Sequence, residues 1–285
     1  MRTLLICHDR AALDREGLAR WLASFSTFTG TVVIREPRVR RRKRIEREIA
    51  RVGIWRFLDV LAFRAFYALT AARGDRQWER LALAHLRASF PELPSAPRVS
   101  VASPNSGEAE AFIRDRRPDL VIARCKALLA ERVFSIPRLG TFVMHPGICP
   151  EYRNAHGCFW AVAAGDRGNV GMTLLRIDTG VDTGPVFGYF RVDAREDESH
   201  VVTQHRAVLE HLNAIRDKLV EIGAGTASPI DTTGRKSAAW GQPWLSALVK
   251  SRRVKGASLK SEVASLPCSG TEADFRLPTS HLRQP

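Results

Sequence analysis

Short apolar runs alternate along this chain with longer segments whose apolar residues recur at helical spacing. Arg2 to Cys7 has the composition of a buried strand, and Thr31 to Ile34 has that of a second strand. Between them the spacing predicts a helix from Asp14, its N-cap, to Phe25. A strand–helix–strand start predicts a parallel sheet covered by helices. We therefore expect an α/β protein with a Rossmann-like, mostly parallel sheet and helices on both faces.

A basic segment at residues 35–92 interrupts this pattern, and we predict that it is a helical insertion. The chain has a formal net charge of +14, and much of that charge falls between Arg38 and Arg51. Such a run predicts contact with RNA or with an anionic membrane surface, whereas a solvated helical face is the alternative interpretation. A helix from Asp75 to Ser89 closes the segment. Five aromatic residues are expected to pack inside the insertion or the core, with a membrane anchor on an amphipathic helix as the less favoured alternative: Trp55, Phe57, Phe63, Phe66 and Tyr67.

Strands and helices resume after residue 92. Strands are predicted at Val99–Ala102, Asp119–Cys125, Thr141–Met144, Gly171–Ile177 and Pro185–Val192. Helices are predicted from a cap at Ser106, at Phe159–Ala164 and, as one long helix, at Asp197–Ile222. We expect residues 1–225 to form the catalytic domain and residues 226–285 to form a short extension. That extension should contain a packed segment around Trp240–Arg253 and a disordered tail.

Several classes of protein are disfavoured by composition. No apolar run is long enough to span a bilayer, and the N-terminus resembles a strand rather than a signal peptide. The five cysteines form no CxxC pair, which predicts reduced thiols in a cytoplasmic protein. The spacing of histidines, cysteines and carboxylates predicts no metal site, and no Walker loop or GxGxxG follows the first strand.

Chemistry is concentrated between Gly140 and Val186. His145 and Asp182 each follow a strand-like run, so we expect both at strand ends, where α/β proteins bind ligands. A histidine and an aspartate brought together there can move a proton during attack on a carbonyl group. Glycines beside Asp182 allow the backbone to approach a flat ligand closely.

The order and spacing of two motifs resemble the folate-dependent formyltransferase superfamily. The motifs are PRLGTFVMHPGICPEYRNA and GMTLLRIDTGVDTGP. The resemblance covers residues 95–195 closely and the first 34 residues loosely. It implies transfer of a formyl group from 10-formyltetrahydrofolate to an amine. It also implies that His145 stabilises the oxyanion while Asp182 assists proton removal and keeps the histidine suitably charged.

The same resemblance assigns further residues. Two loops are expected to hold the pterin through Arg124, Cys125, Lys126, Leu128, Asp178, Gly180 and Val181. The loop after the histidine is expected to contact the acceptor through Tyr152, Arg153, Asn154 and His156. His156 has a second interpretation as a helix cap.

Val143 departs from the family pattern, which has an asparagine two residues before the histidine. Loss of one donor to an oxyanion costs about a hundred- to a thousandfold in rate. Another donor can replace the amide, and the candidates are Asn154, His156, Asn105 and Lys126. Otherwise the reaction tolerates a weaker oxyanion hole, or the protein has lost catalysis and kept ligand binding.

The acceptor is expected to be a small-molecule amine, with an aminosugar nucleotide as first choice. Methionyl-tRNA enzymes have a long C-terminal β-barrel domain, and the resemblance does not extend to such a domain in this sequence. For that reason the small acceptor is preferred to tRNA. A methionyl-tRNA formyltransferase-like enzyme remains an alternative because the basic insertion follows the second strand. Formyltetrahydrofolate hydrolase and a non-catalytic folate- or RNA-binding relative are the others. No prediction is made for the oligomeric state.

Overall fold

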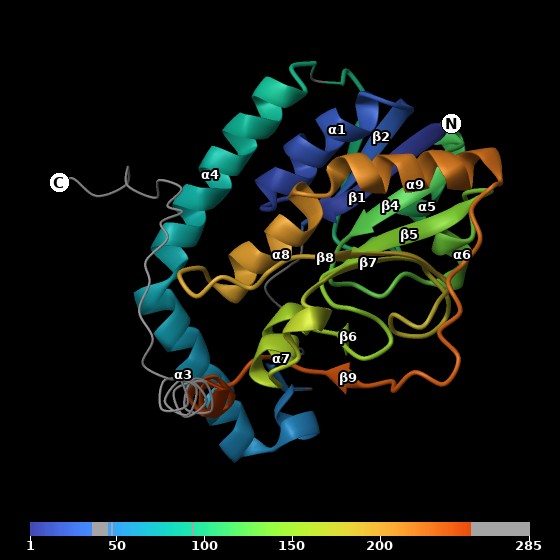
Figure 1. The fold of residues 1–285 in the computed structure, drawn as a ribbon. Helices are drawn as coiled ribbons and strands as arrows, with labels where there is room; N and C mark the ends of the chain where they lie inside the picture. Colours follow the sequence, from blue (N-terminus) through green and yellow to red (C-terminus); the bar gives the residue numbers. More distant parts are fainter. Residues whose placement is uncertain (36–44, 47, 93, 252–285) are drawn as a thin grey trace, which may run out of the picture. The chain divides into compact units, whose positions relative to one another are not determined.

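The computed structural model describes residues 1–35, 45–46, 48–92 and 94–251 (Figure 1). Met1–Ser251 form one compact unit. The predicted tail beyond residue 251 and much of the Arg38–Arg51 run lie outside the described residues.

A seven-stranded sheet forms the centre of this unit. Its strands are β1 (Arg2–His8), β2 (Thr27–Ile34), β3 (Arg98–Val101), β4 (Leu120–Arg124), β5 (Gly140–His145), β7 (Gly171–Arg176) and β8 (Val186–Arg191). The strand order is β3-β2-β1-β4-β5-β7-β8. The first five strands are parallel, whereas β7 and β8 run antiparallel to their neighbours. The predicted mostly parallel sheet is confirmed.

Helices cover both faces of the sheet, as predicted (Figure 1). They are η1 (Leu13–Leu18), α1 (Ala19–Ala23), α3 (Ile54–Thr70), α4 (Ala72–Ser89), α5 (Gly107–Arg116), α6 (Glu131–Phe134), α7 (Gly157–Ala163), η2 (Arg167–Asn169), α8 (His200–Leu209) and α9 (Leu212–Ala224). Side chains alternate along β1, so Leu4 packs with α5 and α6 residues, whereas Leu5 joins the cluster of α1, α8 and α9. Both faces of each central strand are therefore buried, which explains its continuous apolar sequence.

Two predicted helix features are wrong. Asp14 does not cap its helix, because Ala12 occupies the N-cap position and the buried Asp14 carboxylate pairs with Arg124 at 3.1 Å. The single helix predicted from Asp197 to Ile222 is broken between α8 and α9, which meet at an angle (Figure 1). The break redirects the chain so that Ile215 and Leu219 of α9 reach the buried core.

The insertion between β2 and β3 contains α3 and α4, which pack on each other. Phe57 and Phe63 of α3 are buried, as expected for residues that pack in the insertion. The same prediction is wrong for Trp55, whose surface is 82% exposed, because the side chain lies on the helix face opposite the core.

The chain after α9 continues across the same compact unit. Ile230 forms an isolated bridge with Val186, and β9 (Ala239–Trp240) pairs with β6 (Arg153–Asn154). The ring of Trp240 stacks on Tyr152 at 5.9 Å and on Trp160 at 4.8 Å, measured between ring centroids. Residues 245–251 are helical. This segment therefore lies directly against the loop that follows β5.

Candidate active site

His145, the last residue of β5, is buried between two oxygen acceptors. Its Nδ1 lies 3.3 Å from Oδ2 of Asp182, and its Nε2 lies 2.8 Å from the carbonyl oxygen of Tyr152. The contact with Tyr152 is a hydrogen bond, whereas that with Asp182 is an ion-pair distance. The structure thus brings the two predicted catalytic residues together. A substrate atom reaches a nitrogen of this ring only when one of the two oxygens moves aside.

Asp182 is held by the conformation of its own loop and by contacts with the loop that follows β5. Its φ of 52° lies in the left-handed region, which aspartate tolerates better than most residues. The carboxylate accepts a 2.8 Å hydrogen bond from the backbone nitrogen of Asn154. Arg153 donates from Nη1 to the carbonyl oxygen of Val181 at 2.9 Å. These two contacts fix the aspartate loop to the histidine loop.

Thr173 organises the start of the histidine loop. It lies opposite His145 in the β5–β7 register. Its hydroxyl accepts from the backbone nitrogen of Cys149 at 3.0 Å and donates to the carbonyl of Gly147 at 2.7 Å. A Cβ at Gly147 would lie 2.4 Å from the carbonyl oxygen of Tyr152, so only glycine fits there.

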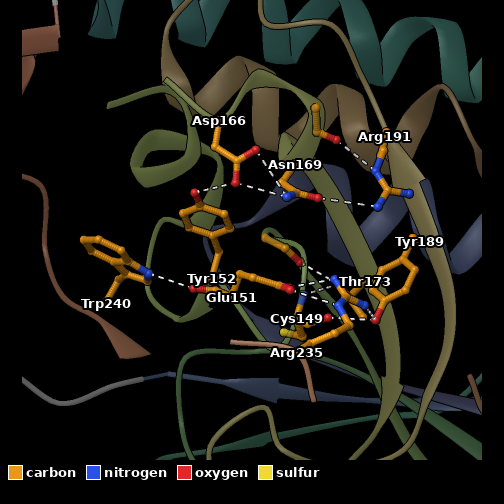
Figure 2. A network of polar contacts seen from close by, with 12 residues as sticks. Cys149, Glu151, Tyr152, Asp166, Asn169, Thr173, Tyr189, Arg191, Arg235 and Trp240 are labelled. Atoms are coloured by element: carbon orange, nitrogen blue, oxygen red, sulfur yellow. Dashed lines mark hydrogen bonds and ion pairs between the residues drawn. The ribbon is translucent and has the colours of Figure 1, made fainter. Parts of the chain in front are cut away.

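A polar network holds the far end of the same loop (Figure 2). Tyr189 donates to the carbonyl of Cys149 at 2.8 Å and accepts from Arg235, which also binds both carboxylate oxygens of Glu151. Tyr152 donates its phenol proton to Asp166 at 2.8 Å. The backbone carbonyl of Tyr152, which contacts His145, therefore lies next to two anchored side chains, those of Glu151 and Tyr152. Burial raises the pKa of the Cys149 thiol well above its usual range, which argues against a nucleophilic role.

Val143 projects from the same face of β5 as His145, because the two residues are two positions apart on one strand. Its side chain packs against a cluster formed by Cys149, Leu175 and Val186. The position at which the family has an amide is therefore lined by apolar groups in this protein.

The candidate replacement donors Asn105, Asn154 and His156 contact other groups of the protein. Asn105 donates to the carbonyl of Leu128 and accepts from the backbone nitrogen of Ala130, both at 2.8 Å. Asn154 donates its side-chain amide to the carbonyl of Trp240 at 2.6 Å. His156 is at the N-cap of α7 but makes no capping bond, and its Nδ1 lies 3.4 Å from Gln204. Burial, and secondarily the neighbouring His200, lowers the pKa of His156 to about 3, so the ring is neutral.

Arg153 has an unused donor that its place in the sequence did not reveal. Its Nε is buried and has no hydrogen-bond partner among the described residues, while its Nη1 anchors the loop of Asp182. A buried guanidinium nitrogen without an acceptor is costly, which makes it a candidate for ligand contact. The sequence placed Arg153 near the acceptor but gave no sign of this orphaned group.

The two expected pterin loops flank β5, which lies between β4 and β7 in the sheet. In the first loop, the backbone nitrogen of Lys126 donates to His8 at 3.2 Å, and Leu128 is 66% exposed. The Arg124 side chain turns inward instead, donating to the carbonyl of Met144 at 2.6 Å. In the second loop, Asp178 accepts from the backbone nitrogen of Gly180 at 2.9 Å. The first loop thus exposes the apolar Leu128, whereas the second carries the polar side chains of Asp178 and Thr183, which bond to each other.

Near the carboxyl end of β1, a cavity of about 510 Å³ lies between η1 and α4. It is lined by Ala12, Leu13, Arg73, Arg76, Glu79, Arg80 and Leu83. The three arginines are spaced for one face of α4, and this spacing is visible in the sequence, whereas the direction in which that face points is not. Strands β1 and β5 are separated by β4 alone, so the carboxyl ends of these two strands are roughly 10 Å apart.

Within the described residues, no group of three or more histidines, cysteines or carboxylates is arranged to hold a metal ion.

Comparison with known proteins agrees with this geometry. A family model described as formyl transferase matches residues 88–217, which contain β5, His145 and Asp182. This matched segment, somewhat less than half of the chain, is similar to the formyl transferase family. The resemblance to the formyltransferase superfamily is therefore confirmed. The match begins at the end of α4, so the formyl transferase domain as matched does not include α3.

Methionyl-tRNA formyltransferases are among the similar sequences. The protein of Thermus thermophilus is 29% identical over 169 residues, which are 58% of this chain and 52% of that protein. The protein of Bacteroides thetaiotaomicron is 33% identical over 133 residues, 43% of this chain and 41% of that protein. This chain thus matches about half the length of such relatives.

Solved formyltransferases share the fold. A sugar N-formyltransferase from Shewanella sp. FDAARGOS_354 is 14% identical with a TM-score of 0.51, covering 85% of this chain and 76% of its own. Phosphoribosylglycinamide formyltransferase from Anaplasma phagocytophilum is 14% identical with a TM-score of 0.53, covering 85% and 99%.

Proposed function

We propose that the protein transfers a formyl group from 10-formyltetrahydrofolate to the amine of a small acceptor. The observation that carries this proposal is the pair of His145 and Asp182, 3.3 Å apart, inside a formyl transferase domain. The loops beside this pair are the ones that the family resemblance assigns to the pterin ring, and we expect their backbone groups to hold it. Gly184 approaches so closely that an added Cβ would lie 1.9 Å from the carbonyl oxygen of Arg176.

In the proposed reaction the amine nitrogen bonds to the formyl carbon, and the bond between that carbon and N10 of the folate breaks. The proton that the amine loses ends on N10. The Asp182 carboxylate assists removal of that proton, and the His145 ring donates to the formyl oxygen as negative charge develops there. For this contact the ring must exchange one of its present acceptors for the substrate.

Arg153 takes the part of the missing amide in this proposal. Its guanidinium is anchored beside Asp182 through Val181, and its unpartnered Nε is a donor available to an oxyanion. A fixed positive charge stabilises a developing oxyanion at least as well as a neutral amide does. This assignment explains how the site can function with Val143 in the family's asparagine position.

The arginine-lined cavity favours an aminosugar nucleotide as the acceptor. Arg73, Arg76 and Arg80 face one space, and guanidinium groups bind phosphate oxygens through paired hydrogen bonds. The volume of about 510 Å³ is that of a small-molecule site.

The direct test combines the purified full chain with 10-formyltetrahydrofolate and a panel of nucleotide-linked aminosugars. We expect N-formylated sugar, identified by mass spectrometry, in amounts equal to the tetrahydrofolate formed. A second arm omits the amine and measures formate. A third arm supplies methionyl-tRNA.

Formate release at the same rate without an amine would identify a hydrolase. Formylation of methionyl-tRNA alone, with no formylated sugar, would show that the acceptor is tRNA rather than a small molecule. Folate binding without turnover in any arm would leave a binding protein.

A further inference from the structure

Helix α3 has two apolar faces, one buried and one exposed on the opposite side of the helix. Phe57, Val60 and Phe63 are buried against the core. The opposite side exposes large apolar residues, among which Trp55 is 82% and Leu69 87% exposed. An isolated exposed leucine needs no explanation, but a contiguous apolar patch marks an interaction surface.

The outer face is continuous along the whole helix. With 3.6 residues per turn, one side of α3 carries Ile54, Leu58, Leu61, Ala65 and Leu69, with Trp55 at its margin. All six are exposed. We call this set the outer face of α3. It contains no charged residue.

The charged residues of α3 are turned away from this face, toward residues 242–246. The guanidinium of Arg56 lies 4.3 Å from the ring centroid of Trp244. Asp59 accepts from the backbone nitrogen of Ser246 at 3.0 Å, and Arg64 lies 3.5 Å from Gln242. The charged groups are thus engaged with other residues of this chain, although Arg56 and Arg64 themselves remain exposed. An ordinary surface helix exposes mainly polar residues, so an exposed apolar face on the other side of α3 is unusual.

We propose that the outer face of α3 docks on an anionic lipid bilayer, with the helix lying in the plane of the interface. No helix in the described part of the chain is long and apolar enough to cross a membrane, so α3 would lie on the surface. Residues 35–64 contain eleven Lys or Arg against four Asp or Glu. Anionic lipid headgroups attract such a segment toward the surface, where the apolar side chains enter the acyl boundary.

Charge also favours the bilayer over two other partners. A second copy of this chain would bring one strongly basic segment against another, because the chain has a net charge of +14. The basic segment would attract RNA phosphates as well, but an uncharged apolar helix face adds nothing to phosphate contacts, whereas the acyl boundary of a bilayer accepts it. The proposal does not depend on the reaction that the site catalyses.

Vesicle sedimentation of the full chain tests the proposal. We expect binding to vesicles of phosphatidylglycerol and phosphatidylcholine, and at least about tenfold weaker binding to phosphatidylcholine alone. Leu58→Glu/Leu69→Glu should weaken binding to the anionic vesicles about a hundredfold, because two apolar contacts are replaced by repelled charges. The matched control is Val220→Glu, which adds an acid at a 48% exposed apolar site on α9 and should bind like the wild type.

Brominated lipids add a positional readout. They should quench tryptophan emission of the wild type and quench that of Trp55→Phe far less. Equal vesicle binding by Leu58→Glu/Leu69→Glu and Val220→Glu would overturn the proposal. A dimer in light scattering that Leu58→Glu/Leu69→Glu dissociates, without vesicle binding, would assign the face to self-association. Salt-sensitive RNA binding that weakens in the same variant, again without vesicle binding, would assign it to RNA.

Discussion

The loop after β5 and the outer face of α3 treat polar and apolar groups in opposite ways. In the loop, backbone carbonyls and ionisable side chains are buried and paired with each other. His145, for example, lies between the Asp182 carboxylate and the Tyr152 carbonyl. On α3, large apolar side chains face outward. The loop lies within residues 88–217 that match the formyl transferase family, and α3 lies before them. The difference suggests that the family segment holds the chemistry, while the insertion contributes recognition of partners.

The largest expected effect separates two aspartates of one loop. Asp182→Asn should lower kcat about a thousandfold, because it removes the carboxylate that assists proton transfer. Asparagine still accepts from the backbone nitrogen of Asn154 and tolerates the left-handed backbone, so folding should be unchanged. Asp178→Asn is the comparison variant, because Asp178 lies in the same loop but is expected to contact the pterin, so that its loss should raise the KM for the folate rather than lower kcat. Equal losses in both variants would show that Asp182 acts through loop structure.

A second prediction tests Arg153 as the replacement for the family's asparagine. Arg153→Gln should lower kcat about a hundredfold, as does loss of other oxyanion donors. Val143→Asn alone should change little, but Val143→Asn/Arg153→Gln should recover at least about tenfold over Arg153→Gln. Thermal melting of each variant controls for the lost contact with Val181. Arg153 is not the replacement donor if Val143→Asn/Arg153→Gln is no faster than Arg153→Gln while Val143→Asn alone accelerates the reaction.

A smaller effect is expected in the cavity formed by the insertion. Arg76→Gln/Arg80→Gln should raise KM for an aminosugar nucleotide about tenfold and leave kcat close to its original value, because each arginine contributes binding to a remote phosphate. Arg216→Gln on α9 removes a charge at a surface ion pair and serves as the control. An unchanged KM would show that the cavity does not bind the acceptor. A loss of kcat alone would contradict a role of these arginines in binding only.

The smallest effect concerns stability and pH at the junction of the two regions. Burial lowers the pKa of His200 to about 4, and His156 beside it is lowered to about 3. The unfolded chain therefore binds more protons than the folded one between about pH 4 and 6.5. The free energy of unfolding should fall as pH drops through that window, by at most about 1.4 kcal/mol per pH unit for each histidine.

Denaturant unfolding at pH 7 and pH 5 measures this slope. His200→Gln should show a shallower decline than the wild type, whereas His85→Gln, at an exposed position of α4, should match it. Parallel declines in all three proteins would contradict the assignment of the slope to the buried rings.

Local sequence patterns predicted the sheet well because buried parallel strands are continuous apolar runs. The motif around His145 and Asp182 predicted their pairing, since both residues lie on strand-flanking loops with family spacing. Partners distant in sequence could not be anticipated in this way. Asp14 looked like a cap, but its carboxylate meets Arg124, 110 residues later, inside the fold. Trp55 looked like a packing residue because its spacing did not reveal which face of α3 meets the core.

The stacked rings beside the active-site loop form a built-in optical probe. Trp240 lies between Tyr152 and Trp160, and Trp244 meets Trp160 edge-on at 4.5 Å. Indoles at such separations couple electronically, so their near-ultraviolet circular dichroism depends on their relative orientation. The carbonyl of Trp240 accepts from Asn154, whose backbone nitrogen bonds to Asp182. Any rearrangement that frees His145 for a ligand would therefore change the spectrum of the unlabelled protein.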